Sequence, residues 1–329
     1  MRAIVCPSYG PADLLQLVDV PTPVPGPKEV LVRTYATTVS TGDWRLRSGQ
    51  FPDGFGWIAK LVVGMKGPRQ PILGTELSGV VEAVGSAVTR FKKGDAVFAF
   101  GDVGLRCHAE FRCFAQDGLI VPKPPNLTFE EAAALSFGGT TALDMLRRAK
   151  VQPGEHVLVN GASGGVGSAA VQLAKALGAQ VTGICSTGNM ELVKSLGADR
   201  VIDYTQVDFT KESTRYDVII DVAGTAPYAR SRLALKDNGR LALVLASLGE
   251  NLGALWVGLT TGHRVIAGPV GIGPEDMRQL AELAAQGKYT AVVEQRFPLE
   301  RIADAHRVVD TGHKRGAVVV TLDARSSTR

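Results

Sequence analysis

The residues with the clearest chemistry form a glycine-rich loop that leads from a short apolar strand into a helix. The loop covers positions 161–167, reads Gly-Ala-Ser-Gly-Gly-Val-Gly, and follows the apolar run Val157–Val159. Glycines at this spacing permit a tight turn and let a pyrophosphate approach the backbone, while free N–H groups at the helix start face its negative charge. We expect a dinucleotide cofactor here, its pyrophosphate held by Ser163, Gly164, Gly165 and Val166.

The end of the following strand indicates which dinucleotide fits the loop. An NAD site usually carries Asp or Glu there, to bind the two ribose hydroxyls. Here positions 186–189 read Ser-Thr-Gly-Asn, and no acid occurs in this turn before Glu191. Small hydroxyl and amide side chains leave room for a 2′-phosphate, so the sequence favours NADPH over NADH. The residues expected around the adenosine phosphate are Ser186, Thr187 and Asn189.

The elements that position these residues alternate between strands and helices. Such alternation predicts an α/β domain with a parallel, doubly wound sheet. The expected strands are His156–Asn160, Gln180–Cys185, Val201–Asp203, Asp217–Val222 and Arg240–Leu245, and the expected helices between them include Gly165–Gly178 and Asn189–Leu196.

Residues 1–122 have a different pattern, with short alternating apolar runs separated by Gly and Pro. We expect an irregular antiparallel barrel here, and one helix from Thr128 that continues beyond Gly138. The C-terminal segment is expected to pack back onto the barrel, so 1–122 and 272–329 form one domain and 123–271 the inserted one. The expected elements are strands Val30–Ala36, Leu77–Val84, Ala96–Phe100, Leu119–Val121 and Gly316–Thr321, and helices Glu275–Gln286 and Leu299–Asp310.

The composition excludes several classes of protein. With 329 residues, 45% hydrophobic and 21% charged, the chain is neither disordered, collagen-like nor a coiled coil. Its net charge of +4 comes without a dense basic cluster, so no nucleic-acid partner is expected. Four cysteines without a CxxC pair, and an N-terminus without signal-peptide organisation, predict a cytoplasmic protein.

The most apolar stretch is Gly54–Met65, which Lys60 interrupts. It is too short to span a membrane. We expect it to border the substrate site, where it either covers an apolar substrate or packs on the barrel. A role at a membrane surface is a weaker alternative.

Several short motifs, spread over nearly the whole chain, carry a resemblance to a known family. With them the sequence resembles the medium-chain dehydrogenase/reductase superfamily, in the branch of zinc-free quinone oxidoreductases and enone reductases. The resemblance implies a GroES-like barrel domain that holds an inserted Rossmann domain, with the active site in the cleft between them. The motifs are Arg47–Gly49, Leu73–Val80, Gly94-Asp95, Glu131–Leu135, Gly139–Leu143, Asn160–Gly167, Ala170–Lys175 and Leu196–Asp199.

Zinc alcohol dehydrogenases of this superfamily hold their catalytic metal with Cys and His, and the matching positions here are Ser40 and Thr75. A hydroxyl is a poor zinc ligand beside a thiolate or an imidazole, so no zinc is expected. The structural zinc site of the family needs four cysteines, whereas only Cys107 and Cys113 fall in that region. Without a metal to hold an alkoxide, hydride delivery to an already electrophilic carbon is the easier reaction.

The resemblance also implies roles for single residues near the cofactor. Thr141 matches a threonine near the nicotinamide, and Tyr204 matches a tyrosine near the adenosine phosphate. Arg315, next to Lys314, lies where related chains place a cation near that phosphate. Each residue also has a structural alternative. Thr141 can pack within a helix, Tyr204 can pack at a strand end, and Arg315 can belong to a charged turn.

In the first domain Asp43 matches the family, with the capping of a turn as its structural alternative. Arg45 and Phe51 replace two tyrosines of related quinone reductases, which removes two phenolic hydroxyls. No convincing general acid is found, so solvent or a ribose hydroxyl is expected to supply the proton. The candidate catalytic residues are Ser40, Asp43, Thr75 and Thr141.

The expected function is that of an NADPH-dependent, zinc-independent oxidoreductase that delivers hydride to a quinone or an α,β-unsaturated carbonyl compound. One alternative is an NAD(P)-dependent alcohol or aldehyde dehydrogenase. Another is a nucleotide-binding, crystallin-like protein without turnover, because a fold does not fix a function. A homodimer is also expected, since family members commonly pair the edge strands of their Rossmann domains, and Arg240–Leu245 is compatible with that role.

Overall fold

The computed structural model describes residues 1–101 and 104–322 of the chain. The chain forms two compact units, of which the first comprises 1–51, 56–137 and 273–329, and the second 52–55 and 138–272. The boundaries expected for a catalytic and a nucleotide-binding domain stay predictions. Among the residues that the structure describes, no helix is both long and apolar enough to cross a membrane.

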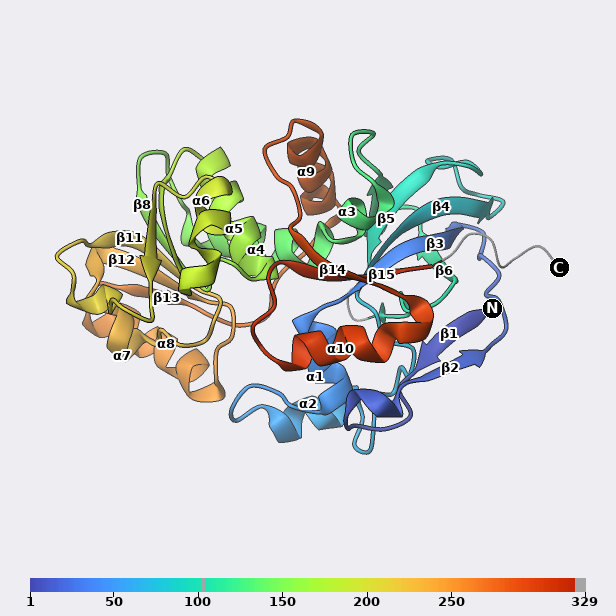
Figure 1. The fold of residues 1–329 in the computed structure, drawn as a ribbon, viewed down its shortest axis with the longest axis horizontal. Helices are drawn as coiled ribbons and strands as arrows, with labels where there is room; N and C mark the ends of the chain where they lie inside the picture. Colours follow the sequence, from blue (N-terminus) through green and yellow to red (C-terminus); the bar gives the residue numbers. More distant parts are fainter. Residues whose placement is uncertain (102–103, 323–329) are drawn as a thin grey trace. The chain divides into compact units, whose positions relative to one another are not determined.

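Six parallel strands form the sheet of the second unit, in the order β10-β9-β8-β11-β12-β13 (Figure 1). This is the strand order 3-2-1-4-5-6 of a Rossmann sheet, so the prediction of a doubly wound parallel sheet is confirmed. The strands are β8 (His156–Asn160), β9 (Gln180–Cys185), β10 (Arg200–Asp203), β11 (Tyr216–Asp221), β12 (Leu235–Leu243) and β13 (Arg264–Ile266).

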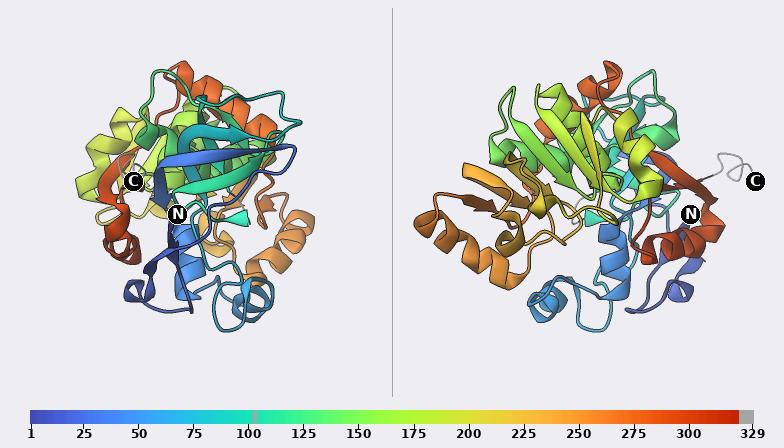
Figure 2. Two further views of the ribbon diagram at one scale, coloured as in Figure 1. Left: turned by 90° about the vertical axis from the view of Figure 1, so that its right-hand side faces the viewer. Right: turned by 60° about the vertical axis from the view of Figure 1, so that its left-hand side comes forward.

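Helices cover both faces of this sheet, with α5 and α6 on one face and α7 and α8 on the other (Figure 1, Figure 2). Strands that are buried on both faces need continuous apolar runs, and Val157–Val159 and Val218–Ile220 are fully buried accordingly. The helices of this part are α4 (Ser136–Ala149), α5 (Gly165–Ala176), α6 (Met190–Ser195), α7 (Tyr228–Ser231) and α8 (Leu248–Thr260), with single turns η3 (Thr187–Asn189) and η4 (Phe209–Lys211).

The strand expected to pair with a second copy is not an edge strand. β12 contains most of the segment Arg240–Leu245, and it is hydrogen-bonded to β11 on one side and to β13 on the other. The short strand β13, which follows α8, forms this edge of the sheet instead. The sequence did not reveal β13 because only three residues of it are paired.

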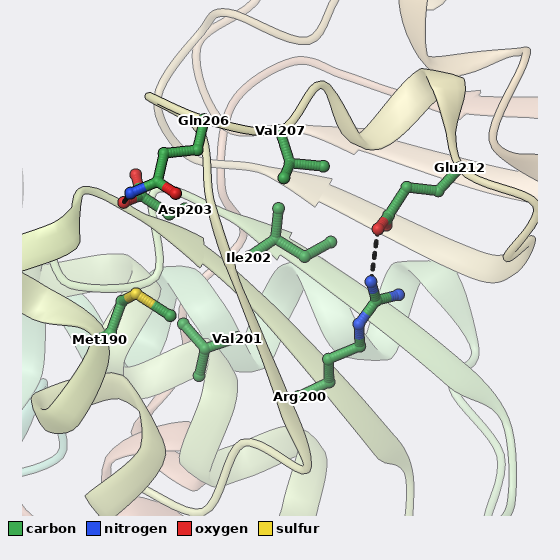
Figure 3. A pocket seen from close by; sticks show the side chains of 8 residues that line it. All are labelled: Met190, Arg200, Val201, Ile202, Asp203, Gln206, Val207 and Glu212. Atoms are coloured by element: carbon green, nitrogen blue, oxygen red, sulfur yellow. Dashed lines mark hydrogen bonds and ion pairs between the residues drawn. The ribbon is translucent and has the colours of Figure 1, made fainter.

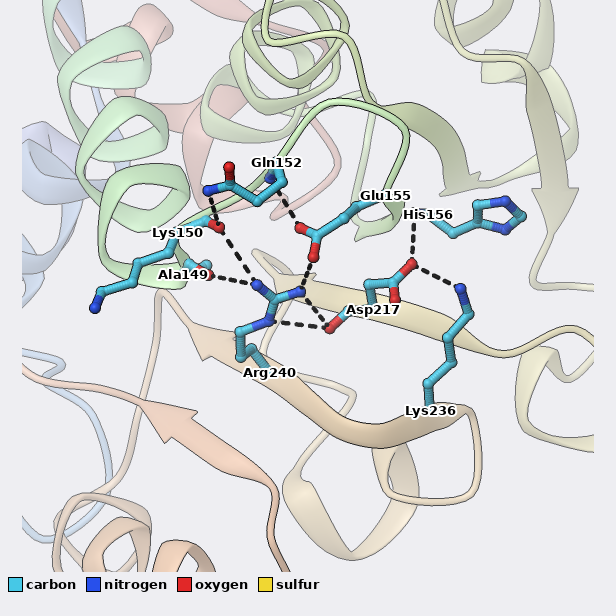
Figure 4. A network of polar contacts seen from close by, with 8 residues as sticks. All are labelled: Ala149, Lys150, Gln152, Glu155, His156, Asp217, Lys236 and Arg240. Atoms are coloured by element: carbon cyan, nitrogen blue, oxygen red, sulfur yellow. Dashed lines mark hydrogen bonds and ion pairs between the residues drawn. The ribbon is translucent and has the colours of Figure 1, made fainter.

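A network of polar contacts ties the amino ends of β8, β11 and β12 together (Figure 4). The guanidinium of Arg240 donates to the carboxylate of Glu155 at 2.6 Å and to the carbonyl oxygen of Ala149, at the end of α4, at 3.1 Å. The carboxylate of Asp217 accepts from Lys236 and from the backbone N–H of His156, both at 2.8 Å. These contacts fix the end of the sheet that lies opposite the glycine loop.

The first unit contains a seven-stranded sheet in the order β14-β15-β3-β4-β5-β7, with β6 as a further partner of β3. The pairing is antiparallel as predicted, except that β14 runs parallel to β15. β15 pairs with β3, so the C-terminal segment does pack onto the N-terminal strands. The strands are β3 (Glu29–Val39), β4 (Glu76–Val84), β5 (Ala96–Phe100), β6 (Phe111–Ala115), β7 (Ile120–Pro122), β14 (Val293–Pro298) and β15 (Ala317–Thr321), beside the separate pair β1 (Arg2–Val5) and β2 (Gln16–Asp19).

The helix expected from Thr128 onward is interrupted. Thr128 and Glu131 form a capping box, but α3 (Phe129–Ala133) ends after five residues and α4 starts at Ser136. The remaining helices of the first unit are α1 (Thr41–Ser48), α2 (Gly56–Val63), α9 (Pro274–Ala285) and α10 (Ile302–Asp310), with single turns η1 (Ala12–Leu14) and η5 (Leu299–Arg301).

Candidate functional site

A cluster of two hydroxyls and one carboxylate lies at the start of α1. Ser40 is the N-cap of this helix and forms a capping box with Asp43. The Asp43 carboxylate accepts from the Ser40 hydroxyl at 2.6 Å, from the Ser40 N–H at 2.8 Å and from the Gly74 N–H at 3.1 Å. The Thr75 hydroxyl completes the cluster, with its oxygen 3.3 Å from the same carboxylate and 3.2 Å from the Ser40 oxygen.

The geometry of this cluster bears on what its members can do. Ser40 and Thr75 lie 35 positions apart in the sequence, and the fold brings both hydroxyls against one buried carboxylate. The Ser40 hydroxyl donates to Asp43 and accepts from the Asp43 N–H, so its hydrogen-bonding capacity is largely used. Thr75 has the longer contacts, and its hydroxyl is the member best able to turn toward a substrate oxygen.

Glu76, which follows Thr75, is a buried acid whose importance the sequence analysis missed. Its carboxylate accepts from the Thr38 hydroxyl at 2.5 Å and from the backbone N–H of Phe137 at 2.6 Å. Burial raises the pKa of this carboxyl from 4.5 to about 7, with a smaller effect of Asp43 in the same direction, whereas Thr38, the Phe137 N–H and Lys314 lower it. An acid directly before the expected strand Leu77–Val84 was the available signal.

The contact with Phe137 explains the interruption between α3 and α4. The first N–H groups of a helix have no partner within the helix. The Phe137 N–H belongs to the first turn of α4 and donates to Glu76. A helix that ran on from α3 would use this N–H internally, so the buried acid and the helix start depend on each other.

Two histidines lie side by side in the core of the first unit, with ring centroids 5.9 Å apart. His108 Nε2 lies 2.9 Å from the Thr38 carbonyl oxygen, and the buried guanidinium of Arg47 donates to His306 at 3.3 Å. Burial, with His108 and Arg47 nearby, holds the pKa of His306 well below its usual range. Arg47 also pairs with Asp310, so these groups join α1 to α10.

The glycine loop opens α5 as expected. Gly164 is the N-cap of this helix, so the N-cap residue itself offers no side chain to the first N–H groups. A Cβ at Gly167 would lie 2.0 Å from the Gly161 carbonyl oxygen, and Gly161 itself has a φ of +84°. The loop therefore requires glycine at these two positions, and it leaves the positive end of the helix open to an anion. Ser163, Gly165 and Val166 lie in the same turn.

The turn after β9 holds Ser186, Thr187 and Asn189. The Asn189 amide donates to the Ser186 hydroxyl at 3.0 Å, and its buried Oδ1 has no partner among the described residues. An acceptor without a partner suits a hydroxyl donor such as that of a ribose. Tyr204 follows the neighbouring strand β10, and 56% of its surface is exposed.

The structure corrects the expectation that no acid lies at this turn. Asp203, the last residue of β10, pairs in register with Cys185 of β9 and accepts from the Thr187 hydroxyl at 2.5 Å. Its carboxylate also accepts from Thr205 at 2.8 Å and Gln206 at 3.2 Å. The Thr187 hydroxyl and these other donors hold the pKa of Asp203 below its usual value. The sequence analysis missed this acid because Asp203 belongs to β10, whereas the turn follows β9.

A shallow hollow of about 210 Å³ extends along β10 from Asp203 (Figure 3). Arg200 is paired with Glu212 on the wall of this hollow. After Lys194, Arg200 is the cation that lies nearest in the sequence to the turn that follows β9. The hollow is smaller than the 300–1,000 Å³ typical of sites that enclose a ligand. Its walls are formed by Met190, Arg200, Val201, Ile202, Asp203, Gln206, Val207 and Glu212.

The other predicted residues lie as follows. Thr141 is buried in α4 of the second unit, together with the glycine loop. Arg315 belongs to the first unit, is exposed, and uses its backbone N–H to bind Glu294 at 2.8 Å. Its proximity to the adenosine phosphate stays a prediction. Burial lowers the pKa of the neighbouring Lys314, against the opposing effect of Glu76 and Glu294.

Arg45 and Phe51 occupy the two positions where the sequence analysis expected the loss of a tyrosine hydroxyl. Arg45 is half-buried, its pKa is lowered by burial, and NH1 donates to the Gln50 carbonyl oxygen at 3.4 Å. The Phe51 ring packs edge-on against Tyr9 at 6.4 Å between centroids. The Tyr9 hydroxyl is already used, because it donates to the Gly64 carbonyl oxygen at 2.6 Å.

No three His, Cys, Asp or Glu side chains are grouped to hold a metal ion within residues 1–101 and 104–322. The Cys107 sulfur accepts from the Arg112 guanidinium at 2.8 Å, and burial raises the pKa of this thiol to about 11. Burial raises the pKa of Cys113 to about 11 as well.

Comparison with known proteins gives two family matches. Residues 26–142 match the alcohol dehydrogenase GroES-like domain, and residues 196–320 match a zinc-binding dehydrogenase domain. A chloroplastic quinone-oxidoreductase of Triphysaria versicolor is 33% identical over 97% of this chain and 98% of its own length. A chloroplastic NADPH-dependent alkenal/one oxidoreductase of Arabidopsis thaliana is 30% identical over 97% of this chain and 79% of its own.

A solved structure shares the same architecture. The quinone oxidoreductase of Escherichia coli, in complex with NADPH, superimposes with a TM-score of 0.83 at 25% identity. The match covers 98% of this chain and all of the other. The antiparallel first unit and the Rossmann sheet of the second unit are thus combined in one chain in both proteins.

Proposed function

The chain belongs to the medium-chain dehydrogenase/reductase superfamily, in the quinone oxidoreductase and alkenal/one reductase branch, and we propose that it is an NADPH-dependent, zinc-independent reductase of quinones or α,β-unsaturated carbonyl compounds. The observation that carries the proposal is the pair Ser40 and Thr75. Their hydroxyls converge at 3.2 Å, where the metal-binding dehydrogenases of the superfamily have Cys and His. Neutral hydroxyls bind zinc poorly but can donate to an oxygen that gains negative charge.

The residues of the second unit fit a dinucleotide. The start of α5, whose N-cap is a glycine, leaves its first N–H groups open to an anion, and the close approach of Gly167 to the Gly161 carbonyl oxygen keeps the turn before it tight. Ser163, Gly164, Gly165 and Val166 would hold the pyrophosphate there. When bound, a reduced nicotinamide cofactor supplies the hydride.

The first unit would bind the acceptor. Thr75 would turn its hydroxyl proton from Asp43 to the carbonyl oxygen of the substrate as charge develops on that oxygen, while Asp43 would keep Ser40 in place. An enone or a quinone carries its own electron-withdrawing carbonyl, so this modest stabilisation is enough to direct hydride to carbon. Thr141, in the second unit, would contribute from the nicotinamide side.

We propose NADPH rather than NADH, with Ser186, Thr187, Asn189 and Tyr204 around the adenosine end. Asp203 opposes this preference by its charge, but it is only 6% exposed and accepts from three neighbouring side chains. The Arabidopsis relative is named for NADPH, which supports the choice. Arg315 is the cation proposed near the phosphate.

The test is the consumption of reduced cofactor by purified, chelator-treated protein. The acceptors are a small enone, a long-chain alkenal and a naphthoquinone, and a primary alcohol is tested with NADP⁺ as a hydride donor for the reverse direction. Oxidation of NADPH by an enone or quinone, faster than that of NADH and unaffected by chelator, is expected. Thr75→Val should lower kcat by about a hundredfold or more, whereas Thr89→Val, outside the cluster, should not.

Two other results would contradict the proposal. Turnover of the alcohol alone, lost on chelation, would indicate a metal-dependent alcohol dehydrogenase. Binding of NADPH without reduction of any acceptor would favour a nucleotide-binding protein without turnover.

We further propose a homodimer, in which β13 rather than Arg240–Leu245 provides the sheet edge. Sedimentation equilibrium tests this, and a monomer at micromolar concentration would contradict it. A cytoplasmic location stays a prediction, since both relatives described above are chloroplastic.

A further inference from the structure

The helix α2 and the residues after it expose an unusual apolar surface. No residue of α2 is buried. Trp57, Val62 and Met65 have 69%, 68% and 56% of their surface exposed, and Ile58 and Leu61 each have 43%. The four positions within α2 recur at helical spacing and form one stripe, and Met65 follows two residues after the end of the helix. The structure therefore does not support the expectation that this segment only packs on the barrel.

The stripe is held by defined contacts. The Arg69 backbone N–H donates to the Val63 carbonyl oxygen, and its guanidinium donates to the Leu61 carbonyl oxygen at 2.8 Å. The Tyr9 hydroxyl binds the Gly64 carbonyl oxygen at 2.6 Å, and the Lys60 ammonium lies 5.6 Å from the centre of the Tyr9 ring. The apolar side chains are thus presented by a fixed element.

The charged residues of the segment that carries the stripe have one sign. Between Gly54 and Thr75 the sequence has three cations, Lys60, Lys66 and Arg69, and no Asp or Glu. None of the three has an ion-pair partner among the described residues. Lys66 and Arg69 are exposed. We use "α2 surface" for these three cations together with Trp57, Ile58, Leu61, Val62 and Met65.

The helix α8 provides an internal contrast. It exposes Leu252, Leu255, Trp256 and Leu259 to a similar or greater degree. Its only charged residue is Glu250, in the first turn. An exposed apolar helix face therefore occurs twice in this protein. The α2 surface differs from α8 because its apolar face is combined with three cations.

This combination identifies an occupant. A two-fold contact between copies through the α2 surface would bring the cations of both copies together, which is unfavourable. A layer of anionic headgroups over acyl chains complements both the cations and the stripe. Helices with Trp and Leu on one face and Lys or Arg beside it lie in the plane of such an interface. Trp is also enriched at this depth.

We propose that the α2 surface docks the protein peripherally on an anionic lipid bilayer. α2 would lie in the interface, with Trp57 and Val62 inserted below the headgroups and Lys66 and Arg69 among them. This inference goes beyond the proposed reductase activity and does not depend on it. Binding is expected to be reversible and to weaken with salt, because each cation near the surface strengthens it by about fivefold.

The test is flotation with vesicles of phosphatidylglycerol and phosphatidylcholine in equal amounts, against vesicles of phosphatidylcholine alone. The protein should float only with the anionic vesicles, and Trp57→Ser with Val62→Ser should abolish this. Lys66→Gln with Arg69→Gln should weaken binding by about 25-fold, from about fivefold per charge. The matched control is Trp256→Ser with Leu259→Ser in α8, which should float as the unchanged protein does.

Circular dichroism and elution volume of each variant accompany the flotation. Equal binding to both kinds of vesicle, absence of binding, or an equal loss in the α8 variant would overturn the proposal. A change in elution volume confined to the α2 variants, in a protein that does not float, would instead assign this surface to contacts between copies. Flotation needs neither cofactor nor acceptor, so its failure is distinguishable from failure of the proposed activity.

Discussion

The free energy of unfolding is expected to fall as the pH rises because Glu76 loses its proton. Replacing Glu76 with glutamine should remove this fall. Burial raises the pKa of this carboxyl from 4.5 to about 7 in the folded protein. Between these two values the folded state holds a proton that the unfolded state has lost. The free energy of unfolding therefore falls by about 1.4 kcal/mol per pH unit across this window, on the order of 3 kcal/mol in all. The loss is complete above the folded pKa.

Glutamine keeps the shape of the side chain without its titration. Its amide oxygen can still accept from the Phe137 N–H, and the Thr38 hydroxyl can turn to accept from the amide. Any cost of this exchange is constant with pH. The difference in unfolding free energy between Glu76→Gln and the unchanged chain should thus shift in favour of the variant by on the order of 3 kcal/mol from pH 4.5 to 8.

Urea unfolding at several pH values measures this difference. The fluorescence of Trp44 reports on the first unit, because its ring packs against the cluster around Ile302 and Val318. The other two tryptophans, Trp57 and Trp256, are replaced by phenylalanine in both chains that are compared. The pH dependence of the unfolding free energy that the two chains share cancels in the difference. The remaining pH dependence belongs to Glu76 and the groups coupled to it.

Glu82→Gln is the matched control, since Glu82 lies on the same strand but is paired with Lys93 at 2.9 Å. Its pKa is lowered rather than raised, chiefly by the hydrogen bond to Lys93. Its contribution to stability is lost only as the pH falls through that lowered pKa, so its difference curve should be flat from pH 5 to 8. An equally flat curve for Glu76→Gln would refute the reasoning about burial.

Three further outcomes are expected. Gly167→Ala should abolish the fluorescence change of NADPH on binding and destabilise the protein by about 1–3 kcal/mol, because its Cβ would lie 2.0 Å from a loop carbonyl oxygen. Gly253→Ala, where a Cβ meets nothing within 4 Å, should do neither. Arg47→Met should cost about 1–3 kcal/mol in thermal unfolding, since it leaves the buried His306 Nδ1 and the Gly10 carbonyl oxygen without their donor, whereas Arg301→Ala, at an exposed ion pair, should cost less than about 1 kcal/mol. Incubation with a chelator should leave the rate of acceptor reduction unchanged, and a loss restored by zinc would contradict the role given to the hydroxyl pair.

Much of the second unit could be predicted because its signals are local. A strand buried on both faces must be a continuous apolar run, and a phosphate-binding turn must be rich in glycine. His156–Asn160 and Gln180–Cys185 accordingly match β8 and β9 at both ends. The helix from Gly165 was expected two residues too long, since Gly178 lies beyond its end with a φ of +83°.

The first unit was harder to predict, since many of its contacts join distant segments. A short element such as α1 produces too few periodic positions to stand out, and the apolar stretch of α2 gave no sign of its exposed face. The interruption between α3 and α4 depends on Glu76, about 60 positions earlier in the chain. Local propensity favours one continuous helix there, and a tertiary contact overrides it.

For the candidate site, the sequence by itself determined the glycine loop, the hydroxyls at Ser40 and Thr75, and the family, because each depends on residue identity within a short segment. Only the tertiary structure decided how these groups are partnered. In the structure the two hydroxyls meet beside Asp43, and Glu76 is buried. Asp203 lies at the turn that was expected to lack an acid, where it accepts from Thr187. Solvation and hydrogen bonding set the charge of an acid, and both depend on which distant segments surround it.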